Sequence, residues 1–157
     1  SGHYNTRLQE WIGRSLDSRP NDLPVPGKLV LILGEYMHRN YHGRYYAKGQ
    51  NVRRLLTQSY NDALEGCDVL AMPTIPFATP PLAEPDCSIE DNMRSVLNMI
   101  NNTCQADLTG HPAISVPCGK NDDDLPIGLM LMGRHFDDFT VLRVADSIEK
   151  SGDWKSR

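Results

Sequence analysis

The sequence predicts an α/β fold in which short apolar strands form a sheet flanked by helices. Two apolar runs, at residues 113–116 and 127–132, are separated by a polar segment rich in turn residues, which is typical of two hairpin strands. A third apolar run, at residues 67–72, directly follows a long helical pattern, as in many α/β proteins. Because the two hairpin runs do not alternate strictly between apolar and polar residues, we expect helices to cover both of their faces.

The composition predicts one domain with a core of its own. The chain has 157 residues, and its 16 basic and 20 acidic residues give a formal net charge of -4. The basic residues do not cluster as they do in nucleic-acid-binding proteins, so we expect no nucleic-acid partner. No apolar run approaches the ~20 residues that span a bilayer, and the N-terminus has no signal-peptide pattern. The chain begins with Ser1 rather than methionine, and we expect it to be a piece of a longer protein.

The four cysteines are Cys67, Cys87, Cys104 and Cys118, and their spacing is wide and irregular. Since no two of them form a Cys-x-x-Cys pair, the sequence disfavours a zinc site or a redox motif. Unpaired cysteines fit a reducing compartment, so a cytoplasmic location is expected.

The first part of the chain predicts a helix, a loop and a long apolar segment. Residues 4–16 predict a helix with Asn5 or Thr6 as its N-cap. Its apolar residues share one face: Leu8, Trp11, Ile12 and Leu16. Residues 18–28 are rich in proline and glycine and are the best candidate for a hinge loop. Residues 29–46 begin with an apolar run that fits either a buried helix or a strand, and Gly43 is expected to interrupt this segment.

A second helix is predicted over residues 46–65, followed by the strand at 67–72, which Pro73 should stop. The predicted inner stripe of the helix consists of Val52, Leu55, Leu56, Ser59 and Ala63. The residues expected to face water are Arg53, Arg54, Asn61 and Asp62. Gly66 is expected to be the C′ glycine of the helix.

Two further helices complete the predicted pattern. Ser88, followed three residues later by Asp91, resembles a capping box and opens a helix that should run to about Cys104. The residues expected on one side of that helix are Met93, Val96, Leu97, Ile100 and Cys104. Asp137 or Asp138 is expected to cap the last helix, and residues 151–157 are predicted to be a frayed tail. The inward residues of the last helix should be Phe139, Leu142, Ala145 and Ile148.

Isolated polar residues give little support for a catalytic or metal site. His38 and His42 could share a helix face with Glu35, but the His-Glu-x-x-His order of a zinc protease is absent. Ser115 and His111 are close in sequence, yet a nucleophilic serine usually occupies a strained turn rather than an apolar strand. We therefore expect Ser115 to be a hydrogen-bonded core hydroxyl and His111 to hydrogen-bond the turn.

The carboxylates do not form a recognisable pair. Glu35, Asp68 and Asp107 are scattered, so no acid–base dyad is predicted. The acidic run at residues 122–124 lacks the glycine and the distal glutamate of a calcium loop and is expected to be a solvated turn. The sequence accordingly predicts no cofactor and no metal site.

Two segments carry a family resemblance. Residues 109–119 are Thr-Gly-His-Pro-Ala-Ile-Ser-Val-Pro-Cys-Gly, and residues 125–133 are Leu-Pro-Ile-Gly-Leu-Met-Leu-Met-Gly. Together they resemble the C-terminal part of the amidase signature family, and the resemblance extends from about Leu29 to about Lys150. It implies a mixed sheet flanked by helices in an α/β/α arrangement. Related amidases carry a segment similar to Gly-Glu-Tyr at 34–36 on a helix, so the resemblance favours a helix there.

The resemblance also implies a chemistry whose catalytic residues this chain lacks. Amidase signature enzymes hydrolyse carboxamides with a serine nucleophile, a second serine whose peptide bond is cis, and a lysine. Those residues lie in and before a run rich in glycine and serine, and no such run occurs in this sequence. We therefore assign no catalytic residue here and expect the chain to be the C-terminal third of an amidase. Its partners would be a small amide substrate and the rest of the amidase, with a homodimer as an open alternative.

Two positions bear on the substrate pocket. Ile100 and Val30 fall where the resembling amidotransferases tend to carry an acidic residue and an arginine. Such a charged pair would hold the ammonium and carboxylate of an amino acid. Because both residues are apolar here, the pocket is expected to take an uncharged aliphatic or aromatic amide, as in the nitrile-pathway amidases that residues 34–36 and 41–46 resemble. Plain helix core is the alternative for Ile100.

A second function class stays open. A non-catalytic binding or scaffolding module derived from an amidase would also lack the catalytic run. That class predicts that the apolar residues 29–32 and the strand at 67–72 are covered within this chain. A fragment predicts exposed apolar faces and unpaired strand edges instead.

Overall fold

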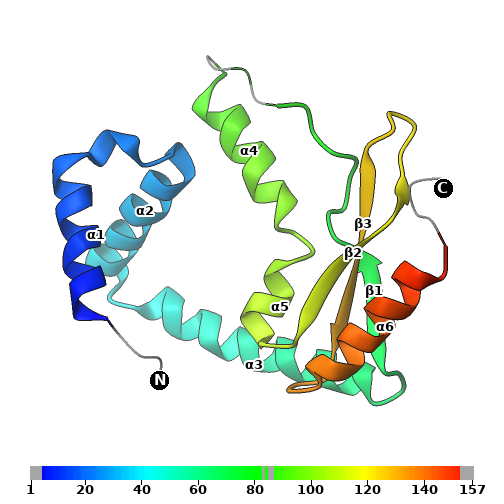
Figure 1. Ribbon diagram of the computed structural model, residues 1–157. Helices are drawn as coiled ribbons and strands as arrows, with labels where there is room; N and C mark the ends of the chain where they lie inside the picture. Colours follow the sequence, from blue (N-terminus) through cyan, green and yellow to red (C-terminus); the bar gives the residue numbers. More distant parts are fainter. Residues whose placement is uncertain (1–4, 83, 85–86, 153–157) are drawn as a thin grey trace. The chain divides into compact units, whose positions relative to one another are not determined.

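The computed structural model describes residues 5–82, 84 and 87–152, and it divides into two compact units, Ser1–Gly43 and Arg44–Arg157. Each unit is described by itself. The first contains the helix α1 (Thr6–Ser18), a short 3-10 turn η1 (Pro20–Asp22) and the helix α2 (Val25–Tyr41), as Figure 1 shows. The Asn5 side chain accepts a hydrogen bond from the Leu8 backbone N–H at 3.2 Å and caps α1, as predicted.

The predicted loop at residues 18–28 is shorter than expected. Helix α2 already begins at Val25, because Pro24 is extended and Pro26 falls in the first helical turn, where its missing N–H is not needed. A hinge in this segment stays a prediction. The apolar run at 29–33 lies in α2 and is helical, as the resemblance implied. After Tyr41 the chain turns at His42, with φ of 49°, and at Gly43, with φ of 78°, which confirms the predicted interruption.

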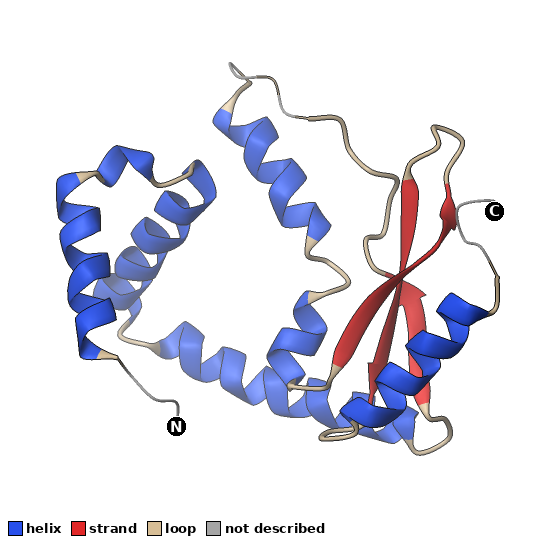
Figure 2. Ribbon diagram, in the orientation of Figure 1, coloured by secondary structure: helices blue, strands red, loops and turns tan. Residues whose placement is uncertain are grey.

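The second unit contains a three-stranded sheet and four helices of the described residues, which Figure 2 distinguishes by colour. The helices are α3 (Arg44–Leu64), α4 (Ile89–Met99), α5 (Cys104–Thr109) and α6 (Asp138–Lys150). The strands are β1 (Val69–Pro73), β2 (Ala113–Lys120) and β3 (Pro126–Gly133). Their order is β1-β3-β2 with antiparallel pairing, whereas the resemblance implied a mixed sheet for the whole family fold.

The second half of β3 is buried on both faces, whereas Pro126 and Ile127 at its start are exposed. Leu131 packs on one face with Val116 of β2 and with Val141 and Ala145 of α6. Met130 points to the opposite face and is also buried. Both hairpin strands are longer than predicted. Residue 117 is a proline, but β2 is an edge strand with a bulge between residues 117 and 119, so the missing N–H is tolerated there.

Three helical predictions were wrong in detail. Helix α4 ends at Met99 rather than near residue 104, because residues 101–103 are asparagine and threonine, whose side chains compete for backbone hydrogen bonds. On α6, Ala145 and Ile148 pack in the core as predicted, but Leu142 and Phe139 are 57% and 76% exposed, and Val141 is buried instead. Gly66 does not adopt the left-handed conformation of a C′ glycine.

The apolar stripe predicted for the inside of α3 is exposed. Val52 is 53% exposed and Leu55 is 72% exposed, whereas Leu64 near the end of the helix is buried. In the first unit, neither α1 nor α2 as described contains a buried residue. Both units therefore carry apolar helical surface that the described residues do not cover. Across those residues, no helix has the length and apolar content needed to cross a membrane.

Candidate functional site

A cluster of hydrogen bonds forms where β1 and β3 meet. The Thr74 N–H donates to the Gly128 carbonyl at 2.9 Å, and the Thr74 and Ser115 hydroxyl oxygens lie 2.5 Å apart. The Asn102 side-chain amide donates to the Pro73 carbonyl at 2.8 Å and joins the α4–α5 connection to the end of β1. A Cβ at Gly128 would lie 2.8 Å from both hydroxyl oxygens, so glycine leaves room for the hydroxyl pair.

Next to this cluster lies a mainly apolar cavity of about 330 Å³. It is lined by Pro73, Ile75, Pro76, Phe77, Ala78, Thr79, Asn121, Pro126, Ile127 and Gly128. The side-chain oxygen of Asn121 is already used, because it accepts hydrogen bonds from the backbone N–H groups of Asp123 and Leu125 at 3.1 and 2.8 Å. With apolar walls and no charged lining residue among the described residues, the cavity suits an uncharged apolar group.

Ser115 and His111 do not form a catalytic pair. The Ser115 hydroxyl hydrogen-bonds Thr74. Both ring nitrogens of His111 have other partners: Nδ1 lies 2.8 Å from the Thr109 hydroxyl, and Nε2 lies 3.1 Å from Oδ1 of Asn61. The expected hydrogen bond of Ser115 is present, but its side chain is exposed rather than in the core. It points to the face of the sheet opposite α6. Among the described residues, Ser115 therefore has no base placed to activate it.

His111 is a buried structural residue that links three segments. It is 4% exposed, and its ring stacks on that of His135 with centroids 3.9 Å apart. Burial, and then the nearby charge of His135, lower the pKa of His111, so the neutral imidazole is favoured. The one proton of the neutral ring is then on Nε2, which donates to Oδ1 of Asn61. The Thr109 hydroxyl beside Nδ1 also donates to the Gln105 carbonyl at 2.8 Å. The turn role expected for His111 is present, but its bond to Asn61 on α3 was not foreseen.

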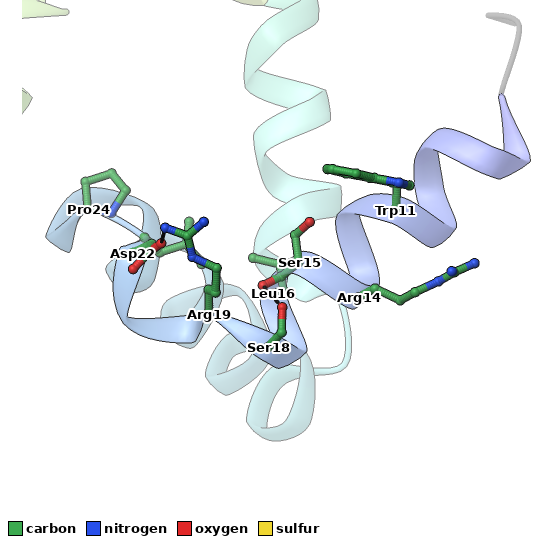
Figure 3. Close-up of a pocket in the computed structure, with 9 residues that line it drawn as sticks. Trp11, Arg14, Ser15, Leu16, Ser18, Arg19, Asp22 and Pro24 are labelled. Carbon is green, nitrogen blue, oxygen red and sulfur yellow. Dashed lines mark hydrogen bonds and ion pairs between the residues drawn. The ribbon is translucent and has the colours of Figure 1, made fainter.

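The first unit has a surface cavity of about 530 Å³ beside α1 and η1, drawn in Figure 3. Trp11 lies at one side, and the ion pair between Arg19 and Asp22 lies at the other. The Ser18 hydroxyl donates to the Ser15 carbonyl at 3.3 Å, which is an ordinary helical contact. No titratable group within the cavity is placed to activate either serine, so it has no catalytic arrangement among the residues described.

His38 on α2 and His42 at its C-cap do not share a metal site with Glu35. Glu35 is held by Arg39, whose Nε lies 2.5 Å from its carboxylate. His42 has left the helix at its left-handed C-cap, so it no longer continues the helical face of His38. Within 5–82, 84 and 87–152, no three histidine, cysteine or acidic side chains lie close enough together to hold a metal ion. In the acidic turn, Asp124 pairs with Lys120 at 2.6 Å.

The two predicted pocket residues lie in different units. Val30 is on α2 and is 68% exposed, while Ile100 follows α4 as its C-cap and is 48% exposed. A shared pocket for them stays a prediction. Helix core, the alternative for Ile100, likewise stays open.

Comparison with known proteins identifies the family. The Amidase family model matches residues 8–142. An uncharacterized protein in the nthA 5′ region of Rhodococcus erythropolis is 42% identical over 149 residues, which cover 95% of this chain and 74% of that protein. A glutamyl-tRNA(Gln) amidotransferase subunit from Methanosarcina mazei is 39% identical over 150 residues, which cover 95% of this chain and 30% of the relative.

A solved structure agrees with these relatives. The crystal structure of the corresponding glutamyl-tRNA(Gln) amidotransferase subunit from Thermotoga maritima superposes with a TM-score of 0.60 at 29% identity. The match covers 89% of this chain and 30% of that one, so the chain spans under a third of these two amidotransferase relatives. The α/β class and the resemblance noted in the sequence are confirmed. The chain belongs to the Amidase family, the amidase signature enzymes, and corresponds to a C-terminal portion of its members.

Proposed function

We propose that this chain is the C-terminal, substrate-pocket-forming portion of a carboxamide hydrolase, which converts an amide to a carboxylic acid and ammonia. The catalytic serine, the second serine with its cis peptide bond and the lysine lie upstream of this chain. The first serine attacks the amide carbon, the second serine and the lysine relay protons, and backbone N–H groups stabilise the oxyanion. This chain contributes pocket walls rather than reacting groups.

Exposed apolar surface carries this proposal. On α2, Val30 and Ile32 are 68% and 69% exposed, and Leu55 on α3 is 72% exposed. Within the described residues β1 pairs only with β3, so its other edge has no strand partner there. A self-contained binding module would cover these surfaces, whereas a portion of a larger amidase would pack them against the rest of the enzyme.

The substrate class follows from the apolar character of the predicted pocket. Ile100 and Val30 stand where a charged pair would otherwise hold an amino-acid substrate, and the cavity beside Phe77 is apolar. An uncharged, linear aliphatic or aromatic amide is therefore the proposed substrate. The amidotransferase relatives are named for a different acceptor, glutamyl-tRNA(Gln), and a glutamine-like substrate is the competing choice.

Complementation tests the proposal. Ammonia release from propionamide, benzamide and glutamine would be measured for this chain alone, and with the N-terminal portion of a related amidase added. We expect ammonia only when both parts are present, and from propionamide or benzamide rather than glutamine. The same N-terminal portion with its catalytic serine replaced by alanine is the control and should be inactive.

Two outcomes would contradict the proposal. Activity of the chain alone that Ser115→Ala abolishes would place a nucleophile in this chain. If the chain is a folded monomer and neither preparation releases ammonia, the binding or scaffolding module would be favoured instead.

The double variant Val30→Arg with Ile100→Asp tests the pocket residues. A new charged pair should lower propionamide turnover and favour glutamine.

A further inference from the structure

Helix α3 carries a polar stripe in addition to its apolar one. Its members recur at spacings of three and four, so they lie on one helical face: Gln50, Arg53, Arg54, Thr57, Gln58 and Asn61. Together with Thr109 at the end of α5 and His135 after β3, they line a cavity of about 520 Å³ within the second unit. Helices α3 and α5 pack against each other in this unit (Figure 1).

The walls of this cavity are rich in hydrogen-bond donors. Arg53 and Arg54 both line it, and neither forms an ion pair within the described part of the chain. Arg53 donates to the side-chain oxygen of Gln50 at 3.3 Å, which leaves the Gln50 amide N–H₂ as a donor. The side-chain oxygen of Asn61 accepts from His111, so the Asn61 N–H₂ is likewise left as a donor.

The cavity also lacks compensating negative charge. None of its lining residues in the described part of the chain is aspartate or glutamate, although acidic residues outnumber basic ones in the sequence. The carboxylate of Asp62 accepts a hydrogen bond from the Gln58 side-chain amide at 2.6 Å, and Asp62 does not line the cavity. Two permanent positive charges, together with the N–H₂ groups of Gln50 and Asn61, are complementary to an oxyanion.

We propose that this cavity is an oxyanion-binding site that takes a carboxylate or phosphate group. Arg53 and Arg54 supply the charge, and Asn61 and His135 complete the donor set. The site is separate from the apolar cavity beside Gly128. The oxyanion belongs either to a free small molecule or to an acidic side chain of a polypeptide, and the chemistry of recognition is the same for both.

NMR titration of the 157-residue chain tests the proposal, with the backbone amides of Thr109 and His135 as reporters. The probes are acetate, inorganic phosphate and a triglutamate peptide, in a low-salt buffer without other oxyanions. We expect saturable shifts that weaken by about tenfold or more in the double variant Arg53→Gln with Arg54→Gln. The control double variant, Arg94→Gln with Arg143→Gln, removes the same charge from exposed positions on α4 and α6 and should bind as the parent does.

The outcomes are distinct. Saturation by acetate or phosphate supports a site for a free anion, and saturation by triglutamate alone supports a site for an acidic polypeptide segment. Absence of saturable shifts with all three probes would overturn the proposal. Equal affinity in the two double variants would overturn it as well, since binding would then follow net charge alone. Circular dichroism melts confirm that each variant is folded.

Discussion

His111 joins three parts of the second unit through one imidazole ring. It hydrogen-bonds Thr109 at the end of α5 and Asn61 on α3, and it stacks on His135 after β3. A buried group with both nitrogens in use can be replaced only at the cost of an unsatisfied partner. The Gly-His-Pro segment of the family resemblance thus has a structural reason in this chain.

The lowered pKa of His111 predicts a pH dependence of stability. The unfolded histidine titrates near 6.5, and the folded one titrates below that value, so the unfolded state binds more protons in this range. The contribution of His111 to the free energy of unfolding should therefore be at its maximum above pH 6.5. It should fall as the pH drops below 6.5 toward the lowered pKa of the folded state. Urea unfolding between about pH 8 and pH 5 measures this.

Two variants show whether His111, rather than other groups that titrate at acidic pH, causes this loss of stability. His111→Gln should lower stability at about pH 8 by about 1–3 kcal/mol, because a buried hydrogen-bond partner is lost, and should flatten the decline at acidic pH. His38→Gln removes an exposed histidine of α2 and should leave the decline unchanged. An undiminished decline in His111→Gln would show that other groups cause it.

Helix α6 packs closely on the end of β3. Gly133 is buried at the end of β3, and an added Cβ would overlap the Cγ2 methyl of Val141 on α6. Val141 is itself only 3% exposed and belongs to the core with Leu131 and Ala145. The close approach of α6 to the sheet therefore depends on a glycine at this position.

Gly133→Ala should lower the free energy of unfolding by about 1–3 kcal/mol, because it overpacks this contact. Gly49→Ala is the matched control: it lies in α3, its Cβ would meet no heavy atom of the described residues within 4 Å, and it should be neutral or stabilising by up to about 1 kcal/mol. Adding Gly133→Ala to a Val141→Ala background should cost much less than in the parent chain. If Gly133→Ala lowers the free energy of unfolding equally in both backgrounds, the contact with Val141 is not the cause of the destabilisation.

Across the whole molecule, the main feature is apolar surface without a cover. Neither α1 nor α2 as described contains a buried residue, and the apolar stripe of α3 is exposed at Val52 and Leu55. The chain also spans only 30% of the Methanosarcina mazei relative. Under the proposed function, these surfaces are interfaces with the upstream part of the amidase.

Leu55→Gln, combined with Val52→Gln, tests this assignment. Both side chains are exposed here, so stability of the isolated chain should change by no more than about 0.5 kcal/mol for each. Affinity for the N-terminal portion of a related amidase should fall about tenfold or more, since burying a leucine contributes about 1.5–3 kcal/mol. Leu125→Gln in the hairpin turn is the control. Unchanged affinity in the α3 variant, measured by isothermal titration calorimetry, would remove this stripe from the interface.

The sequence by itself determined the elements of this protein and its family. Caps at Asn5, Ser88 and Asp137, the interruption at Gly43 and the two hairpin strands follow from local backbone chemistry, which acts between residues near in sequence. The family followed from the ordered residues at 109–119 and 125–133.

Only the tertiary structure decided which helical faces are covered. The apolar stripe of α3 was predicted to face inward, yet Asn61 of its polar stripe contacts His111, and Val52 and Leu55 of the apolar stripe are exposed. The phase of α6 likewise depended on the close approach of Val141 to the position beside Gly133. Periodicity predicts that a helix has an apolar face, but contacts between residues far apart in sequence determine what lies against it.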